Sequence, residues 1–127
     1  MSLPDPEHDC ISLATFRRNG TEVRTPVWFV VSDGKVWVFT LLGTWKVKRL
    51  RRDPRVRFAP CNSSGRRILG PWSEGQARLD EAPERVEWLR KAYKAKYTWQ
   101  YFLIVQVLYR LLGRHGPGLA IEITQTA

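Results

Sequence analysis

The sequence predicts a small, mainly β domain in which six antiparallel strands close into a barrel with two helical insertions. Short runs of apolar and β-branched residues recur along the chain, and Asn19-Gly20 and Asp33-Gly34 supply turns between the first three runs. The 127 residues, 43% of them apolar, suffice for one core. We therefore expect a single domain over residues 1–127, with a polar and flexible N-terminus at 1–9.

The first three strands are expected at residues 11–16, 21–31 and 35–40. Bulky side chains occupy both faces of the second strand, as expected when one face packs in the core and the other lines a pocket or a subunit contact.

The later elements are a helix over 45–53, strands over 55–62 and 70–79, a helical segment over 84–112 and a last strand over 119–123. Asp53-Pro54 stops the first helix, and Gly75 permits a bulge or a close approach inside its strand. The helical segment is expected to break near Thr98. Its apolar positions are Val86, Leu89, Tyr93, Trp99, Phe102, Val105, Leu108 and Leu112.

Positive charge is concentrated at one place in the chain. Seven of the twelve residues from Lys46 to Arg57 are basic, and the whole chain carries a net charge of +9. The segment follows a strand that ends in Gly43-Thr44, so a helix N-terminus and the ammonium groups of Lys46 and Lys48 are expected to meet there. This arrangement indicates a phosphate site.

A solvated helix face is the alternative interpretation of the same spacing. Lys46, Arg49 and Arg52 fall on one side of the helix, whereas Val47 and Leu50 face inward.

Other classes of site find little support. Cys10 and Cys61 are expected as buried free thiols, and His8 and His115 lie too far apart in sequence to form a metal site. The chain has no hydrolase or P-loop motif. It has no signal peptide and no apolar run of the ~20 residues that span a bilayer, so we expect a soluble, cytoplasmic protein.

Several motifs resemble one family in their order and spacing: ISLAT at 11–15, TPVWFV at 25–30, KVKRLRRDPRV at 46–56, EGQARL at 74–79, WQ at 99–100 and IEI at 121–123. This is the split-barrel flavin and deazaflavin family related to pyridoxamine 5′-phosphate oxidase, and within it the group of probable coenzyme F420-dependent oxidoreductases. The resemblance implies a six-stranded split β-barrel that forms a homodimer, with two cofactor sites between the subunits.

The resemblance also implies which residues bind the cofactor. The segment after the third strand corresponds to the family's phosphate site and supplies Thr40, Thr44, Lys46 and Lys48. The second strand passes beside the cofactor ring and supplies Arg24, Thr25, Pro26, Val27 and Trp28. Pyridoxamine 5′-phosphate oxidase has an Arg-Lys pair where this chain has Trp45 and Lys46, and a lysine where it has Phe29. These departures favour coenzyme F420 over FMN.

Coenzyme F420 is a long polyanion, and Arg49 is a further candidate ligand because it can follow the acidic tail together with Lys48, Arg52, Arg66 and Arg67. The resemblance implies hydride transfer from the reduced deazaflavin to an electron-poor small molecule. No residue is assigned as the proton donor, and the tyrosines at 93, 97 and 101 are expected to have packing roles.

Three alternatives remain open: an FMN-binding split barrel, a non-catalytic cofactor or haem-type carrier, and a nucleic-acid-binding barrel. We expect neither nucleic-acid binding nor stable membrane insertion. The apolar residues of the late helix are expected to be buried across the dimer rather than to lie on a membrane surface.

Overall fold

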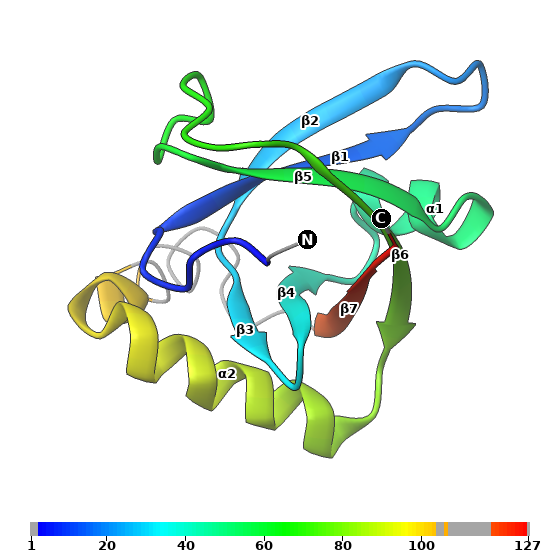
Figure 1. Cartoon of the computed structure of the whole chain (residues 1–127). Helices are drawn as coiled ribbons and strands as arrows, with labels where there is room; N and C mark the ends of the chain where they lie inside the picture. The colour runs from blue at the N-terminus through cyan, green and yellow to red at the C-terminus, as the bar shows by residue number, and fades with distance from the viewer. Residues whose placement is uncertain (1–2, 104–105, 107–117, 127) are drawn as a thin grey trace.

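The structure is a computed structural model that describes residues 3–103, 106 and 118–126. Its strands form one curled antiparallel sheet in the order β2-β1-β5-β6-β7-β4-β3 (Figure 1). The strands are β1 (Cys10–Phe16), β2 (Glu22–Val27), β3 (Val30–Ser32), β4 (Lys35–Leu41), β5 (Arg55–Cys61), β6 (Ser73–Asp80) and β7 (Gly118–Gln125). The helices with described bounds are α1 (Trp45–Arg52) and α2 (Pro83–Tyr97). The expected split β-barrel is thereby confirmed.

The two edges of the sheet are consecutive in the chain. The expected strand over 21–31 is two strands, because β2 pairs with β1 whereas β3 pairs with β4. Trp28 and Phe29 carry the chain from one edge to the other. The expectation of six strands was therefore wrong by one, and this division of the second strand is where the barrel is split.

Two prolines fix which residues of β1 hydrogen bond to which neighbour. Pro26 of β2 faces Ser12, and Pro60 of β5 faces Ile11. Because proline has no N–H, both positions must belong to the pairs that do not exchange hydrogen bonds. These two requirements agree. The N–H and C=O groups of successive residues in β1 point alternately toward β2 and β5, so Ser12 can bond to β5 while Ile11 bonds to β2.

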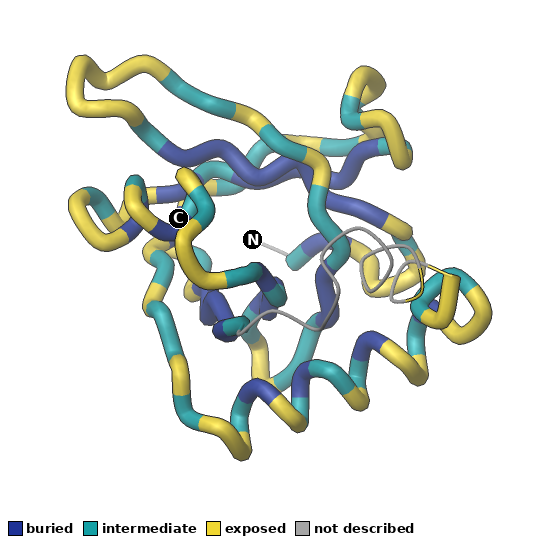
Figure 2. The backbone as a smooth tube through the Cα atoms, turned by 180° about the vertical axis from the view of Figure 1, so that it is seen from behind, coloured by how far each residue is buried: buried dark blue, intermediate teal, exposed yellow. Residues whose placement is uncertain are grey.

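One hydrophobic core fills the barrel. Its fully buried members come from most of the strands and include Leu13, Phe29, Val38, Phe58 and Ile121, and α1 adds Val47 and Leu50 at one end. Figure 2 shows buried residues along the strands and at intervals along α2. The expected buried thiols are confirmed: Cys10 and Cys61 are free and face each other across β1 and β5.

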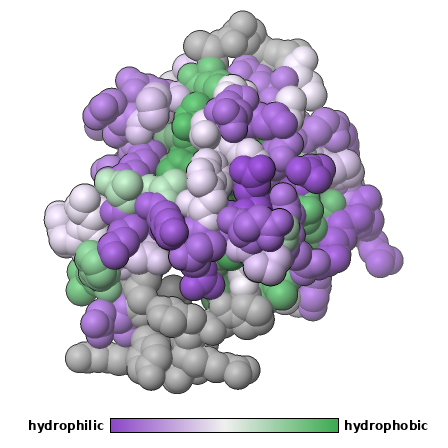
Figure 3. All heavy atoms as spheres, turned by 90° about the horizontal axis from the view of Figure 1, so that it is seen from below, coloured by the Kyte–Doolittle hydropathy of each residue, from purple (hydrophilic) through white to green (hydrophobic). Residues whose placement is uncertain are grey.

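Helix α2 packs outside the barrel and contributes a second cluster of buried side chains. Val30, Trp37 and Ala120 meet Leu89 and Tyr93 there. The hydroxyl of Tyr93 donates to the carbonyl of Trp28 at 2.6 Å and accepts the N–H of Phe39 at 2.8 Å. Seen from below, the side of the molecule on which α2 lies carries many hydrophilic side chains (Figure 3).

The same helix satisfies the backbone where the second strand divides. The Tyr97 hydroxyl accepts the N–H of Phe29 at 3.0 Å and donates to the carbonyl of Asp9 at 2.7 Å, and Lys96 Nζ donates to the carbonyl of Phe29 at 2.8 Å. These bonds replace the ladder that is interrupted there. The expected packing role of Tyr93 and Tyr97 is therefore confirmed.

Local predictions about turns and breaks hold well. Asp33 and Gly34 both have positive φ, as a tight hairpin turn requires, and α2 ends at Thr98, whose φ is 45°. A Cβ on Gly75 would lie 2.8 Å from the carbonyl of Thr124, which confirms the expected close approach. The strand expected over 70–79 instead begins at Ser73, because Leu69 bonds to the carbonyl of Pro60 before the ladder starts.

The start of the described chain packs against the barrel. Pro4 is buried, and Leu3 packs on the barrel core. Val105, Leu108 and Leu112 of the predicted late helix lie outside the described residues. Within the part of the chain that is described, no helix is long and apolar enough to cross a membrane.

Candidate cofactor-binding site

The N-terminus of α1 is built by the turn that follows β4. Gly43 has a φ of 83°, which glycine adopts without strain, and it directs the chain into the cap residue Thr44. The Thr44 hydroxyl accepts the N–H of Val47 at 3.4 Å and lies 3.4 Å from the hydroxyl of Thr40. The predicted phosphate residues Thr40 and Thr44 are thus brought together at a helix N-terminus.

Lys46 lies in the first turn of α1 and is half-buried. It makes no ion pair or hydrogen bond with any described residue. Burial and, second, the charge of Arg49 lower the pKa of its ammonium group. An anion bound beside Lys46 would oppose both effects, so the arrangement is suited to a negatively charged ligand.

The basic face of α1 is anchored on the end of β1. Arg49 Nε donates to the Thr15 hydroxyl at 2.7 Å, and Arg52 donates to the carbonyl of Phe16. Lys48 lies over the ring of Trp45, with 4.5 Å between Nζ and the ring centre. The face is therefore held in place by the barrel and is more than a row of solvated charges.

A cavity of about 400 Å³ adjoins this face and is lined by Arg17, Arg18, Trp45, Arg49 and Arg52. Burial, followed by the charges of Arg17 and Arg52, lowers the pKa of Arg49. Among the described residues, no carboxylate forms an ion pair with any of the four arginines. Four guanidinium groups without a carboxylate partner among the described residues give the cavity a positive potential that suits an anionic ligand.

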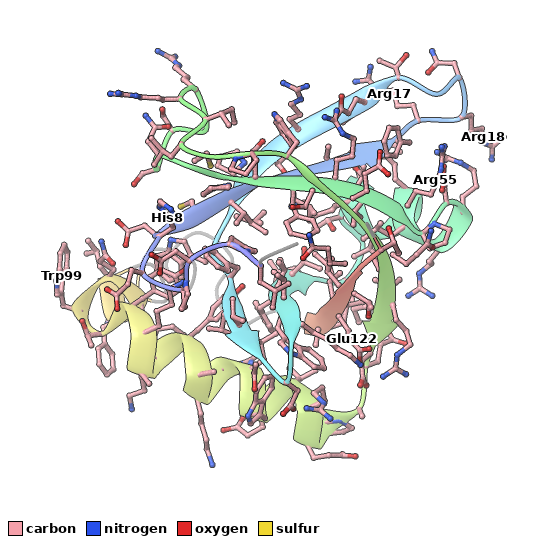
Figure 4. The ribbon with its side chains drawn as sticks, viewed as in Figure 1. His8, Arg17, Arg18, Arg55, Trp99 and Glu122 are labelled. Carbon is pink, nitrogen blue, oxygen red and sulfur yellow. The ribbon has the colours of Figure 1, made fainter. Side chains whose placement is uncertain are left out.

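Arg17 and Arg18 were not predicted as site residues. They lie at the turn between β1 and β2 (Figure 4), far from α1 in sequence. The anchoring of Arg49 and Arg52 on the end of β1 brings this turn beside α1. The available sequence signal was the Arg-Arg pair directly before Asn19-Gly20.

The predicted residues of β2 divide between the two faces of the sheet. Val27 packs against the barrel core, and Thr25 faces the same side, since it pairs with the core residue Leu13. The Thr25 hydroxyl oxygen is buried and has no hydrogen-bond partner among the described residues. Pro26 is exposed on the opposite face.

Arg24 also lies on the outer face, where it has partners of its own. It pairs with Glu22 at 3.3 Å and stacks over Trp72, 4.5 Å from the ring centre. Trp28 stacks on Tyr97, with 4.0 Å between the ring centres. Both tryptophans thus have structural contacts within the chain.

Arg66 and Arg67 are not part of the cavity. They are exposed in the loop that follows β5, whereas α1 precedes β5, so the two groups lie at opposite ends of that strand (Figure 1). Arg55, also near α1, is bound by Asp53 at 2.8 Å. In the described part of the chain, no three His, Cys, Asp or Glu side chains are grouped as a metal site.

Comparison with known proteins decides the family. The family model described as pyridoxamine 5′-phosphate oxidase matches residues 6–124, which is nearly the whole chain. The chain belongs to the pyridoxamine 5′-phosphate oxidase family. Members of this split-barrel family bind flavin-type cofactors. No curated protein sequence matches the chain.

Several solved structures share the fold of this chain. The conserved hypothetical protein Rv2991 from Mycobacterium tuberculosis is 26% identical, with a TM-score of 0.70 over 93% of this chain and 73% of that chain. A protein named F420 reductase is 15% identical, with a TM-score of 0.61 over 98% and 97%. HutZ, the haem storage protein from Vibrio cholerae, is 11% identical, with a TM-score of 0.68 over 95% and 84%.

The residues present fit a phosphorylated flavin-type cofactor. Lys46 has no described partner, the Thr25 hydroxyl is buried and unsatisfied, and Thr40 and Thr44 place two hydroxyls beside a helix N-terminus. Buried polar groups normally have partners, so the unsatisfied Thr25 hydroxyl and the Lys46 ammonium leave hydrogen-bonding capacity that a bound ligand could use.

Proposed function

We propose that the protein is a coenzyme F420-dependent oxidoreductase that acts as a homodimer. Its reaction is hydride transfer from reduced coenzyme F420 to an electron-poor small organic acceptor with a C=C, C=N or nitro group. The cofactor sites lie between the subunits, and the protein works in the cytoplasm without nucleic-acid partners.

The observation that carries this proposal is the excess of unpaired positive charge around α1. FMN carries its charge on one phosphate, which the turn at Thr44 and Lys46 can accommodate. The four arginines of the cavity exceed what one phosphate requires. Coenzyme F420 extends its negative charge beyond the phosphodiester into a carboxylate tail, and the cavity supplies cations for that extension.

When bound, reduced coenzyme F420 supplies a hydride from its deazaflavin ring. The chain's own residues bind and orient the cofactor: Thr44 and Lys46 hold the phosphodiester, and Arg49 and its neighbours hold the tail. Tyr93 and Tyr97 do not donate the proton. Their hydroxyls are engaged with backbone groups, and burial raises the pKa of each.

An FMN-binding protein is the first alternative, since Thr44 and Lys46 also suit the phosphate of FMN. A non-catalytic carrier is the second, since one of the structural neighbours is a haem storage protein. Both alternatives use the same fold and differ in the ligand that binds most tightly.

Titration of the purified protein with coenzyme F420 and with FMN tests the proposal. We expect coenzyme F420 to bind more tightly and Lys46→Ala to weaken it about 10- to 100-fold, the range for loss of a charged hydrogen bond. Lys91→Ala is the matched control, because Lys91 is an exposed lysine on α2. Tight binding of FMN or haem without affinity for coenzyme F420 would replace this proposal with the corresponding alternative.

A further inference from the structure

Three apolar side chains stand exposed where the chain leaves α2. Trp99, Phe102 and Leu103 are 68%, 54% and 56% exposed, whereas most large apolar side chains of the described residues are buried or half-buried. Residues 99–103 are helical, so positions i, i+3 and i+4 place the three on one face. We call them the apolar patch. Figure 4 shows Trp99 at the edge of the molecule, directed away from the barrel.

The opposite face of this helical turn already has a partner. Tyr101 is half-buried and packs against the second cluster between α2 and the sheet. The turn is therefore oriented by the protein itself, with one aromatic inward and the patch outward.

The helix surface next to the patch is basic. Residues 88–103 contain no aspartate or glutamate, and their lysines and arginines are Arg90, Lys91, Lys94 and Lys96. Burial lowers the pKa of Lys96, and the charges of Asp9, Glu7 and Asp5 in the N-terminal segment partly offset this effect. We therefore count only Lys91 and Lys94 as positive charge beside the patch. Lys91 and Lys94 are exposed on the last turns of α2, and Lys94 Nζ lies 5.1 Å from the ring centre of Phe102. Positive charge thus directly adjoins the apolar side chains.

We propose that the apolar patch docks the protein on an anionic lipid surface. Tryptophan, phenylalanine and leucine insert at the boundary between head groups and acyl chains, and neighbouring lysines attract anionic head groups. A second copy of the chain is the competing occupant. If a two-fold axis passed through the patch, Lys91 and Lys94 of both copies would come together and repel each other.

This inference is independent of the proposed cofactor, because the patch shares no residue with the cavity beside α1. It also differs from the expectation that the late helix is buried across the dimer. We infer instead that these three residues contact lipid, and that the protein binds the membrane surface without inserting across it.

Vesicle flotation of the full chain tests the inference. We expect the protein to float with vesicles of phosphatidylglycerol and phosphatidylcholine at low salt, to float far less with phosphatidylcholine alone, and to dissociate as salt screens the charges. The combined variant W99S/F102S/L103S should reduce the bound fraction about tenfold or more. Leu69→Ser is the matched control, since Leu69 is 45% exposed and lies between β5 and β6.

A second variant, K91E/K94E, keeps the apolar side chains and reverses the adjacent charge. It should also abolish flotation, while coenzyme F420 affinity stays unchanged in both variants. The inference is overturned if the wild type does not float with anionic vesicles, or if the three-residue variant floats as well as the wild type. It is also overturned if light scattering shows that this variant turns a dimer into a monomer, because the occupant is then a second copy.

Discussion

The Tyr97 hydroxyl oxygen accepts the backbone N–H of Phe29, 3.0 Å away, across 68 residues of sequence. Phe29 is fully buried and belongs to neither strand at the split of the barrel. Its N–H has no ladder partner, so a helix side chain takes that role. The split is therefore stabilised from outside the sheet.

Tyr97→Phe should destabilise the protein by about 1–3 kcal/mol, the cost of leaving a buried N–H without an acceptor. The free energy of unfolding, measured by urea denaturation, checks this. Tyr101→Phe is the control, because the Tyr101 hydroxyl has no hydrogen bond with a described residue, and it should change stability by less than about 0.5 kcal/mol. Equal losses in the two variants would contradict the role assigned to Tyr97.

Binding of coenzyme F420 should weaken as pH rises through the pKa of Lys46. Only the protonated ammonium attracts the phosphodiester, and burial and Arg49 place its pKa below the ordinary lysine value. The loss should therefore begin at a lower pH than for an exposed lysine. The arginine of the Lys46→Arg variant stays charged throughout, so the affinity of this variant for coenzyme F420 should not change over the same pH range. An identical pH profile for both proteins would rule out Lys46 as the titrating group.

Removing the outer cations of the cavity should distinguish the two candidate cofactors. R17A/R18A should weaken coenzyme F420 about tenfold and leave FMN nearly unchanged, because the acidic tail alone reaches beyond the phosphate. Isothermal titration with each cofactor measures the difference. R66A/R67A, at the other end of β5, is the charge-matched control and should affect neither. A parallel loss for both cofactors in R17A/R18A would place these arginines outside the tail site.

Glu122→Gln should destabilise the protein near neutral pH by about 1–2 kcal/mol. Hydrogen bonds from Lys35 at 2.8 Å and Arg78 at 2.9 Å lower the pKa of this buried carboxyl. Because the pKa of Glu122 is lower in the folded protein than the ordinary glutamate value near 4.5, its carboxylate stabilises the fold fully above that value. This stabilisation is lost as the pH falls through the pKa of the folded state. Urea denaturation should therefore show a difference in free energy of unfolding between the wild type and Glu122→Gln at neutral pH, and this difference should disappear in acid. A difference that does not change with pH would exclude the ionised carboxylate as its source.

Features that depend on neighbouring residues were readable from the sequence. Asp33-Gly34 has the chemistry of a tight turn, and Gly43-Thr44 before a basic amphipathic segment has that of a helix start. The packed faces of α1 followed from the spacing of Val47 and Leu50. These are local preferences that tertiary contacts did not override.

Features that depend on residues distant in sequence could not be predicted from the sequence. The segment over 21–31 alternates like one strand. Its division follows from two hydrogen bonds to α2: the Tyr93 hydroxyl donates to the carbonyl of Trp28, and the Tyr97 hydroxyl accepts the N–H of Phe29. Likewise, Arg17 and Arg18 join the cavity only because α1 rests on the end of β1. Arg66 and Arg67 show the opposite case. They follow β5 in the sequence, whereas α1 precedes it, so the whole length of β5 separates them from α1.

The prolines on either side of β1 also restrict how the barrel can misfold. If β1 slid by one residue against β2 or β5, Pro26 or Pro60 would occupy a position that must donate to the ladder. The same slide would turn Ile11 and Leu13 out of the core. Two separate penalties thus oppose a misregistered sheet: a missing hydrogen-bond donor and the exposure of apolar side chains to water. Both act within β1, β2 and β5 and do not depend on the pairing of β7.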